Sequence, residues 1–180
     1  MSPSNEHLLR DQLVGSARDA FAAYDVRVTG ERLAFVVDDD PRLASVIGFS
    51  GEGMTGELAV VAPRSLMRSS YPVPGRRDSA SEAEVDDWAG EFANQVLGRL
   101  RSRLLMKGLD IQPSTPHTMP ADALPRRRGS ALDACSLRCY ASSEQHDLVE
   151  LWLDFAPASV DLSGDGEGTE ALAPGEVVWF

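Results

Sequence analysis

The sequence lacks the long apolar run that a membrane-spanning helix requires. No window approaches the roughly 18 consecutive apolar residues of a transmembrane segment, and the start, MSPSNEHLLRDQ, turns polar at once. It therefore has no apolar core of the kind found in signal peptides. We expect a cytoplasmic protein. Hydrophobic residues make up 43% of the 180 and charged residues 25%, which is enough to build the core of one domain.

Positive charge is also scarce. The chain has 28 acidic and 17 basic side chains, which gives a net charge of -11. A protein of that sign repels phosphate backbones and anionic lipid headgroups. We therefore expect neither nucleic acid nor a membrane surface among its partners.

Cysteine and histidine, the usual ligands of zinc, are few. Cys135 and Cys139 are the only cysteines, and His7, His117 and His146 lie far apart in sequence. Four zinc ligands cannot be assembled from a second nearby pair, so we expect no metal and no cofactor of the protein's own. The two cysteines fall on one face of a predicted strand, which favours buried small apolar residues; a redox pair is the alternative. No P-loop, HExxH or Ser/His/Asp pattern is present, so the sequence contains no recognisable self-contained active site.

Hydrophobic periodicity predicts the order of the elements. Apolar residues at spacings of three and four predict a helix from Glu6 to Tyr24. Ser81 and Glu84 form a capping-box pattern that begins a second long helix, and Gly108 is suited to end it. The remaining expected elements are strands at 32–37, 43–51 and 56–63 in an antiparallel meander, a short helix within 63–71, a loop at 73–81, an irregular extended run at 109–120, and strands at 132–142 and 147–155.

This order predicts an α+β fold: one mostly antiparallel sheet with two long helices packed on one face. We place the domain at residues 1–155 and an acidic, Gly-rich C-terminal tail at 156–180. The tail ends in GEVVWF, which has three interpretations: a segment that docks back on the domain, a partner-binding peptide, or disorder. The basic loop with Arg126, Arg127 and Arg128 is either solvated or in contact with an acidic partner.

The long helix has two contrasting faces. At about 100° per residue, one face is an apolar stripe made of Val85, Ala89, Phe92, Val96, Leu100 and Leu104. The opposite face carries Asp87, Glu91, Asn94, Gly98, Arg101 and Leu105. Glu91 and Asn94, three residues apart, are neighbours on the helix surface. Gly98 adds no side chain, so another backbone could approach closely there. A carboxylate and an amide on a wet face are most often ordinary solvated surface.

The block EFANQVLGRLRSRLLMKGLDIQPSTPHTM resembles the signature of the CheC/CheX-type chemotaxis phosphatases. In that family a long helix carries Glu-x-x-Asn, a glycine four residues later, a leucine near the helix end and a further glycine, followed by Ser-x-Pro. The matching residues here are Glu91, Asn94, Gly98, Leu105, Gly108, Ser114 and Pro116. The strand pair in IGFSGEGMTGELAVVAP also has a counterpart in the family. One Glu-x-x-Asn motif rather than two makes the chain more similar to CheX than to CheC.

The resemblance implies a protein aspartyl-phosphate phosphatase that acts on a CheY-like response regulator. Asn94 would orient the attacking water, and Glu91 would pair with a lysine of the regulator. Asp87, Gly98 and Arg101 would line the docking surface. Mg²⁺ would belong to the receiver domain of the partner. The resemblance also implies a homodimer. The alternative is a non-catalytic module that binds a receiver or acts as a scaffold in a two-component or chemotaxis signalling complex.

Overall fold

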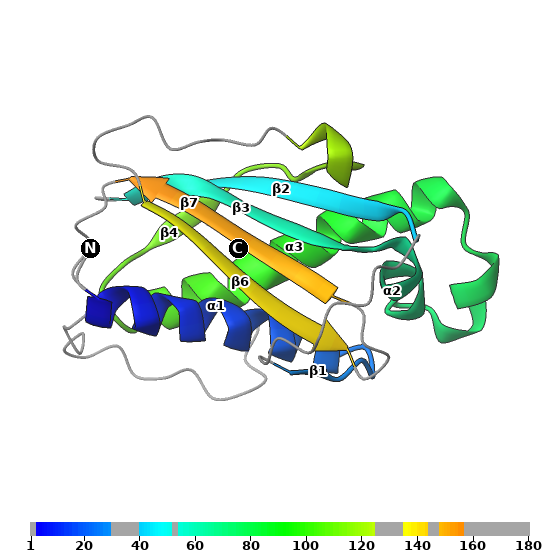
Figure 1. Ribbon diagram of the computed structural model, residues 1–180, viewed down its shortest axis with the longest axis horizontal. Helices are drawn as coiled ribbons and strands as arrows, with labels where there is room; N and C mark the ends of the chain where they lie inside the picture. Colours follow the sequence, from blue (N-terminus) through cyan, green and yellow to red (C-terminus); the bar gives the residue numbers. More distant parts are fainter. Residues whose placement is uncertain (1–2, 30–39, 52–53, 125–134, 144–147, 157–180) are drawn as a thin grey trace, which may run out of the picture.

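A computed structural model describes residues 3–29, 40–51, 54–124, 135–143 and 148–156. Figure 1 shows the chain as one sheet with helices along one side of it. Its strands are β1 (Val28–Thr29), β2 (Arg42–Gly51), β3 (Met54–Pro63), β4 (Ile111–Pro113), β5 (His117–Pro120), β6 (Cys135–Ser143) and β7 (Leu148–Ala156). Its helices are α1 (Pro3–Ala22), α2 (Arg64–Ser69) and α3 (Glu82–Leu105), with short 3₁₀ turns η1 (Pro74–Ser79) and η2 (Ala121–Ala123).

The sheet is antiparallel throughout and has the strand order β1-β6-β7-β3-β2-β4, with β5 also paired to β2. The β2–β3 hairpin pairs from Arg42 with Pro63 to Gly51 with Met54. β7 alternates along its length, and Val149, Leu151, Leu153 and Phe155 are buried. That alternation is the pattern of a strand with one face on the core, so the α+β prediction is confirmed.

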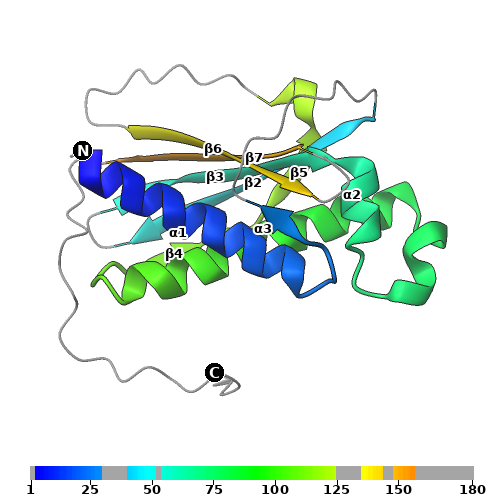
Figure 2. The same ribbon diagram turned by 60° about the horizontal axis from the view of Figure 1, so that its bottom comes forward.

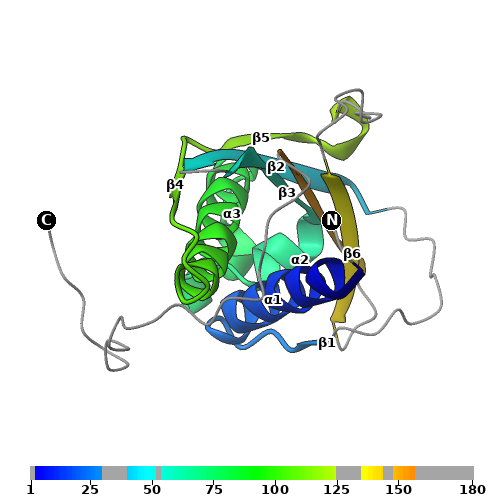
Figure 3. The ribbon, with the colours of Figure 1, turned by 90° about the vertical axis from the view of Figure 1, so that its left-hand side faces the viewer.

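The two long helices pack side by side on one face of the sheet, as Figures 2 and 3 show from two directions. The rings of Phe21 in α1 and Phe92 in α3 lie 4.2 Å apart between centroids. Trp88 packs edge-on against Phe92 and donates its indole N–H to the Ser70 hydroxyl at 3.1 Å. Buried aromatic pairs of this kind add specific packing to the hydrophobic burial, so α3 is firmly held against the domain.

Both ends of α3 follow the sequence prediction. Ser81 and Glu84 form the expected capping box: the Ser81 N–H donates to the Glu84 carboxylate at 2.8 Å, and the Glu84 N–H donates to Ser81 Oγ at 3.3 Å. At the other end the Gly108 N–H donates to the Leu105 carbonyl and the Leu109 N–H to the Leu104 carbonyl. Gly108 has φ +79°. These are the two bonds of a Schellman motif with glycine at C′.

The predicted loop at 73–81 is wrong in part, because residues Pro74–Ser79 form η1. Pro74 sets the first backbone angle of this turn, and the Ala80 N–H closes it on the Arg76 carbonyl at 2.8 Å. Arg77 further fixes the turn by donating to the carbonyls of Tyr71 and Tyr24.

Several predictions lie outside the described residues: the strand at 32–37, the basic loop with Arg126 to Arg128, and the tail from residue 157. Cys135 and Cys139 lie on β6 as expected, but the side chains of that strand are outside the described part. Among the helices that are described, none is long and apolar enough to cross a membrane.

Candidate functional site

The candidate site is the outward face of α3, opposite the helix's buried stripe. Phe92, Val96 and Leu100 are fully buried, whereas Glu91 is exposed and Asn94 is partly exposed. The helix therefore rests on the core along one side and presents the Glu91–Asn94 pair along the other. The buried stripe fixes the direction in which both polar side chains project.

Neither side chain of this pair has a polar partner among the described residues. Across the described ranges, no hydrogen bond or ion pair links the Glu91 carboxylate or the Asn94 amide to another residue. Arg103 of the same helix behaves differently: it donates to Gln12 at 3.1 Å and pairs with Asp19. The carboxylate and the amide are thus free to bind a group that comes from outside.

Gly98 continues the line one turn beyond Asn94. It is exposed, and a Cβ built there would meet no atom within 4 Å. Packing inside the domain therefore does not require a glycine, although glycine costs a helix about 0.5–1 kcal/mol relative to alanine. The domain thus has glycine, a poor helix former, at the point on this face where no side chain projects.

The other two predicted docking residues differ in their surroundings. Asp87 is exposed, one turn before Glu91. Arg101 is half-buried, and its Nε donates to Asp110 Oδ1 at 2.9 Å. This hydrogen bond is the main cause of the lowered pKa of the Asp110 carboxyl. Arg101 is therefore held toward the turn that follows α3, rather than standing free on the predicted docking line.

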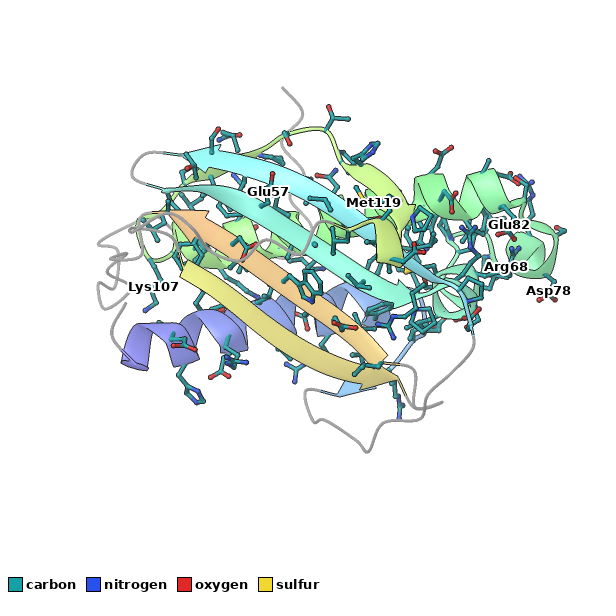
Figure 4. The ribbon with its side chains drawn as sticks, turned by 45° about the horizontal axis from the view of Figure 1, so that its top comes forward. Glu57, Arg68, Asp78, Glu82, Lys107 and Met119 are labelled. Atoms are coloured by element: carbon teal, nitrogen blue, oxygen red, sulfur yellow. The ribbon has the colours of Figure 1, made fainter. Side chains whose placement is uncertain are left out.

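Ion pairs hold the start of α3 to α2. Arg64 pairs with Glu82 and lies 2.9 Å from Asp86, and Arg68 lies 2.5 Å from Glu82. Figure 4 labels Arg68 and Glu82, which lie side by side where the two helices meet. Together with the Trp88–Ser70 hydrogen bond, these contacts make the first turns of α3 a rigid support for the exposed pair.

A groove beside this face was not predicted from the sequence. It has a volume of about 350 Å³ and is lined by Asp86, Asp87, Gly90, Pro116, His117 and Thr118. It forms because β5 pairs with β2 and passes close to α3. A Cβ on Gly90 would lie 3.3 Å from Thr118 Oγ1 and 3.6 Å from Pro116 Cγ. A buried glycine within a helix was the available signal, since a glycine at such a place often marks close packing.

The Ser-x-Pro segment lies next to this helix, although Ser114 follows Glu91 by more than twenty residues in sequence. The Ser114 N–H donates to the Gly48 carbonyl at 2.9 Å, which ties the segment to β2. Pro116 reaches Gly90 of α3. The structure thus brings the two halves of the quoted signature together. In the part of the chain that is described, no group of three or more His, Cys, Asp or Glu side chains could hold a metal ion.

A family model described as "CheX: Chemotaxis phosphatase CheX" matches residues 43–138, which is more than half of the chain. The match includes all of β2 except Arg42, together with β3, α2, α3 and the Ser-x-Pro segment. Among proteins of curated function, none matches this sequence.

Solved structures share the fold at low sequence identity. The chemotaxis protein CheX from Vibrio vulnificus is similar with a TM-score of 0.66 and 17% identity, over 82% of this chain and 95% of that one. CheX in a CheX-CheY-BeF3-Mg²⁺ complex from Borrelia burgdorferi is similar with a TM-score of 0.55 and 13% identity, over 83% and 96%. The middle domain of FliM from H. pylori is similar with a TM-score of 0.54 and 13% identity, over 86% and 93%.

Proposed function

The chain belongs to the CheX family of chemotaxis phosphatases, and on that premise we propose that it hydrolyses the phosphoaspartate of a CheY-like receiver domain. The observation that carries the proposal is the pair formed by Glu91 and Asn94. Both project from the outward face of a helix whose opposite face is buried, and neither has a partner within the described domain.

The roles of this protein and of the receiver in the proposal follow from the chemistry of phosphoryl transfer. Such a reaction needs its nucleophile in line with phosphorus and the charge on the phosphoryl oxygens neutralised, and it needs little covalent chemistry from the protein. Mg²⁺ and a lysine in the receiver would supply the neutralising charge. What remains is to hold one water molecule in line, and a neutral side-chain amide that can both donate and accept hydrogen bonds suits that task.

Asn94 takes this role in the proposal. Its amide is partly exposed, so it can enter a pocket on another protein while its backbone stays within a rigid helix. An aspartate at this place would add a negative charge beside the phosphoryl group, which the chemistry disfavours. Glu91, one turn earlier on the same surface, would pair with a lysine of the receiver and set the angle at which the two proteins dock.

Structural relatives support a receiver as the partner. The Borrelia burgdorferi structure is a complex of CheX with CheY, BeF3 and Mg²⁺, and the present chain shares the fold of its CheX. The homodimer implied by the resemblance stays a prediction, which the molar mass in solution will test.

A non-catalytic receiver-binding or scaffold module is the second candidate, because the FliM middle domain has a similar fold. The two candidates predict different lifetimes for the phosphorylated receiver. Each receiver domain of the host should be phosphorylated, freed of the phosphodonor, and followed with and without this protein. We expect faster loss of phosphate from at least one receiver. Equal decay of every receiver contradicts the phosphatase, and equal decay with stable association supports the scaffold.

A further inference from the structure

An exposed leucine lies on the same line of α3 as the Glu91–Asn94 pair. Three large apolar side chains are exposed in the part of the chain that the structure describes: Val73, Leu105 and Met106, with 47%, 44% and 63% of their surface accessible. Leu105 is the last residue of α3. Exposure of single apolar residues is common, so exposure alone does not indicate a binding role for Leu105. Its position on α3 does.

The helix geometry places Leu105 almost directly in line with Asn94. Eleven residues separate them, which is close to three full turns and leaves an angular offset of only about 20°. Their separation along the axis is about 16 Å. Met106, by contrast, lies about 100° further round the helix. Leu105 therefore projects from the surface that carries the reactive pair, and a single partner could touch both.

Among the described residues, Gly98, Arg101 and Ser102 form the helix surface between Asn94 and Leu105. Gly98 has no side chain and open space around it. The long Arg101 side chain is bonded to Asp110 at 2.9 Å, and Ser102 bonds back to the Gly98 carbonyl at 3.1 Å. The surface from Asn94 to Leu105 is consequently a strip that is low at Gly98 and has an apolar side chain at its end; we call it the low strip.

Leu105 is held in place rather than exposed by fraying of the helix end. Its neighbour Leu104 is buried in the core, and the Leu105 carbonyl accepts from the Gly108 N–H at 2.9 Å. Because the backbone at Leu105 is already fixed, a partner that buries the side chain does not have to order the chain around it, which favours its use in binding.

We propose that Leu105 is a docking anchor that contacts an apolar patch on the receiver domain whose phosphoaspartate meets Asn94. This proposal rests on the proposed function and adds to it the partner's chemistry: an apolar patch about 16 Å from the phosphorylated aspartate, measured along α3. A few residues of a contact surface commonly contribute most of its affinity, and Leu105 is the apolar residue that this surface offers at its end. Leu105 is a positioning residue and takes no part in the chemical step.

The test compares Leu105→Ser with Val73→Ser in steady-state dephosphorylation of the receiver. Val73 is a matched control because it is also an exposed aliphatic residue, but it precedes η1, away from this line. We expect Leu105→Ser to raise KM about five- to tenfold with kcat unchanged, which corresponds to about 1–1.4 kcal/mol of docking free energy. Leu105→Met should restore most of the wild-type KM, and Val73→Ser should leave KM unchanged.

The outcomes separate this proposal from the proposed function. Wild-type acceleration with an unchanged KM for Leu105→Ser overturns the anchor and leaves the phosphatase standing. An equal rise in KM for Leu105→Ser and Val73→Ser also overturns the anchor, because the effect would not depend on the α3 line. If the wild-type protein accelerates no receiver, the proposed function fails and the anchor fails with it. Thermal melting of each variant shows whether the fold is retained.

Discussion

Replacing Gly98 by alanine should stabilise the fold and impair the activity at the same time. A methyl group at this position meets no atom within 4 Å, so it creates no clash inside the domain. Alanine is favoured over glycine in an exposed helix interior by about 0.5–1 kcal/mol. For a protein of this size, each kcal/mol raises Tm by about 2–4 °C.

The same methyl group should obstruct docking. If a partner backbone packs against the low strip on α3, an added methyl overpacks that contact at a cost of about 1 kcal/mol or more, which is about fivefold in KM. The measurements are the free energy of unfolding by denaturant titration, and KM and kcat for the phosphorylated receiver. Gly75→Ala is a matched control, because a Cβ there also meets open space but lies in η1. Unchanged KM for Gly98→Ala would refute the close approach of a partner backbone to Gly98. A loss of stability would refute the claim that a methyl group fits at this position.

The fold makes two further predictions. Gly51→Ala should destabilise the protein by about 1–3 kcal/mol, because its Cβ would lie 2.0 Å from the Asp110 carbonyl oxygen. This effect on stability is opposite in sign to that of Gly98→Ala, and a denaturation midpoint equal to wild type would contradict it. The second concerns acid: the hydrogen bond from the Ser81 backbone N–H, then that from its hydroxyl, lowers the pKa of Glu84. Because the folded pKa lies below the unfolded one, this stabilisation is fully present above the unfolded pKa and is lost as pH falls through the folded pKa. Glu84→Gln keeps a capping amide but removes the titrating carboxyl. The free energy of unfolding of this variant relative to wild type should therefore rise as pH falls through that window. A difference in unfolding free energy that stays constant from neutral pH downward would show that Glu84 is not the cause.

Local patterns were sufficient to predict most of the fold. The helical spacing of Leu9, Leu13 and Ala17 and the alternation in β7 each reflect one buried face, which any single sequence reveals when the element is long. Capping at Ser81 and Gly108 was equally local. The 3₁₀ turn η1 was not predicted, because its order comes from Arg77 bonding to carbonyls as distant as that of Tyr24.

The site was predictable only in part. The helix periodicity placed Glu91, Asn94 and Gly98 on one surface, since that depends on spacing alone. Non-local contacts decided the rest: Arg101 pairs with Asp110 beyond the helix end. The groove beside Gly90 exists because β5 pairs with β2. Neither contact leaves a periodic signal in the sequence.

The central claim is that an outward amide on α3 completes a hydrolytic site on another protein. Its most direct test is kcat for the phosphorylated receiver with the wild-type protein, Asn94→Ala and Glu91→Ala, each checked for an unchanged melting temperature. We predict that Asn94→Ala lowers kcat at least about a hundredfold, as loss of a positioned nucleophile does, whereas Glu91→Ala mainly raises KM. Wild-type kcat in Asn94→Ala would contradict the account.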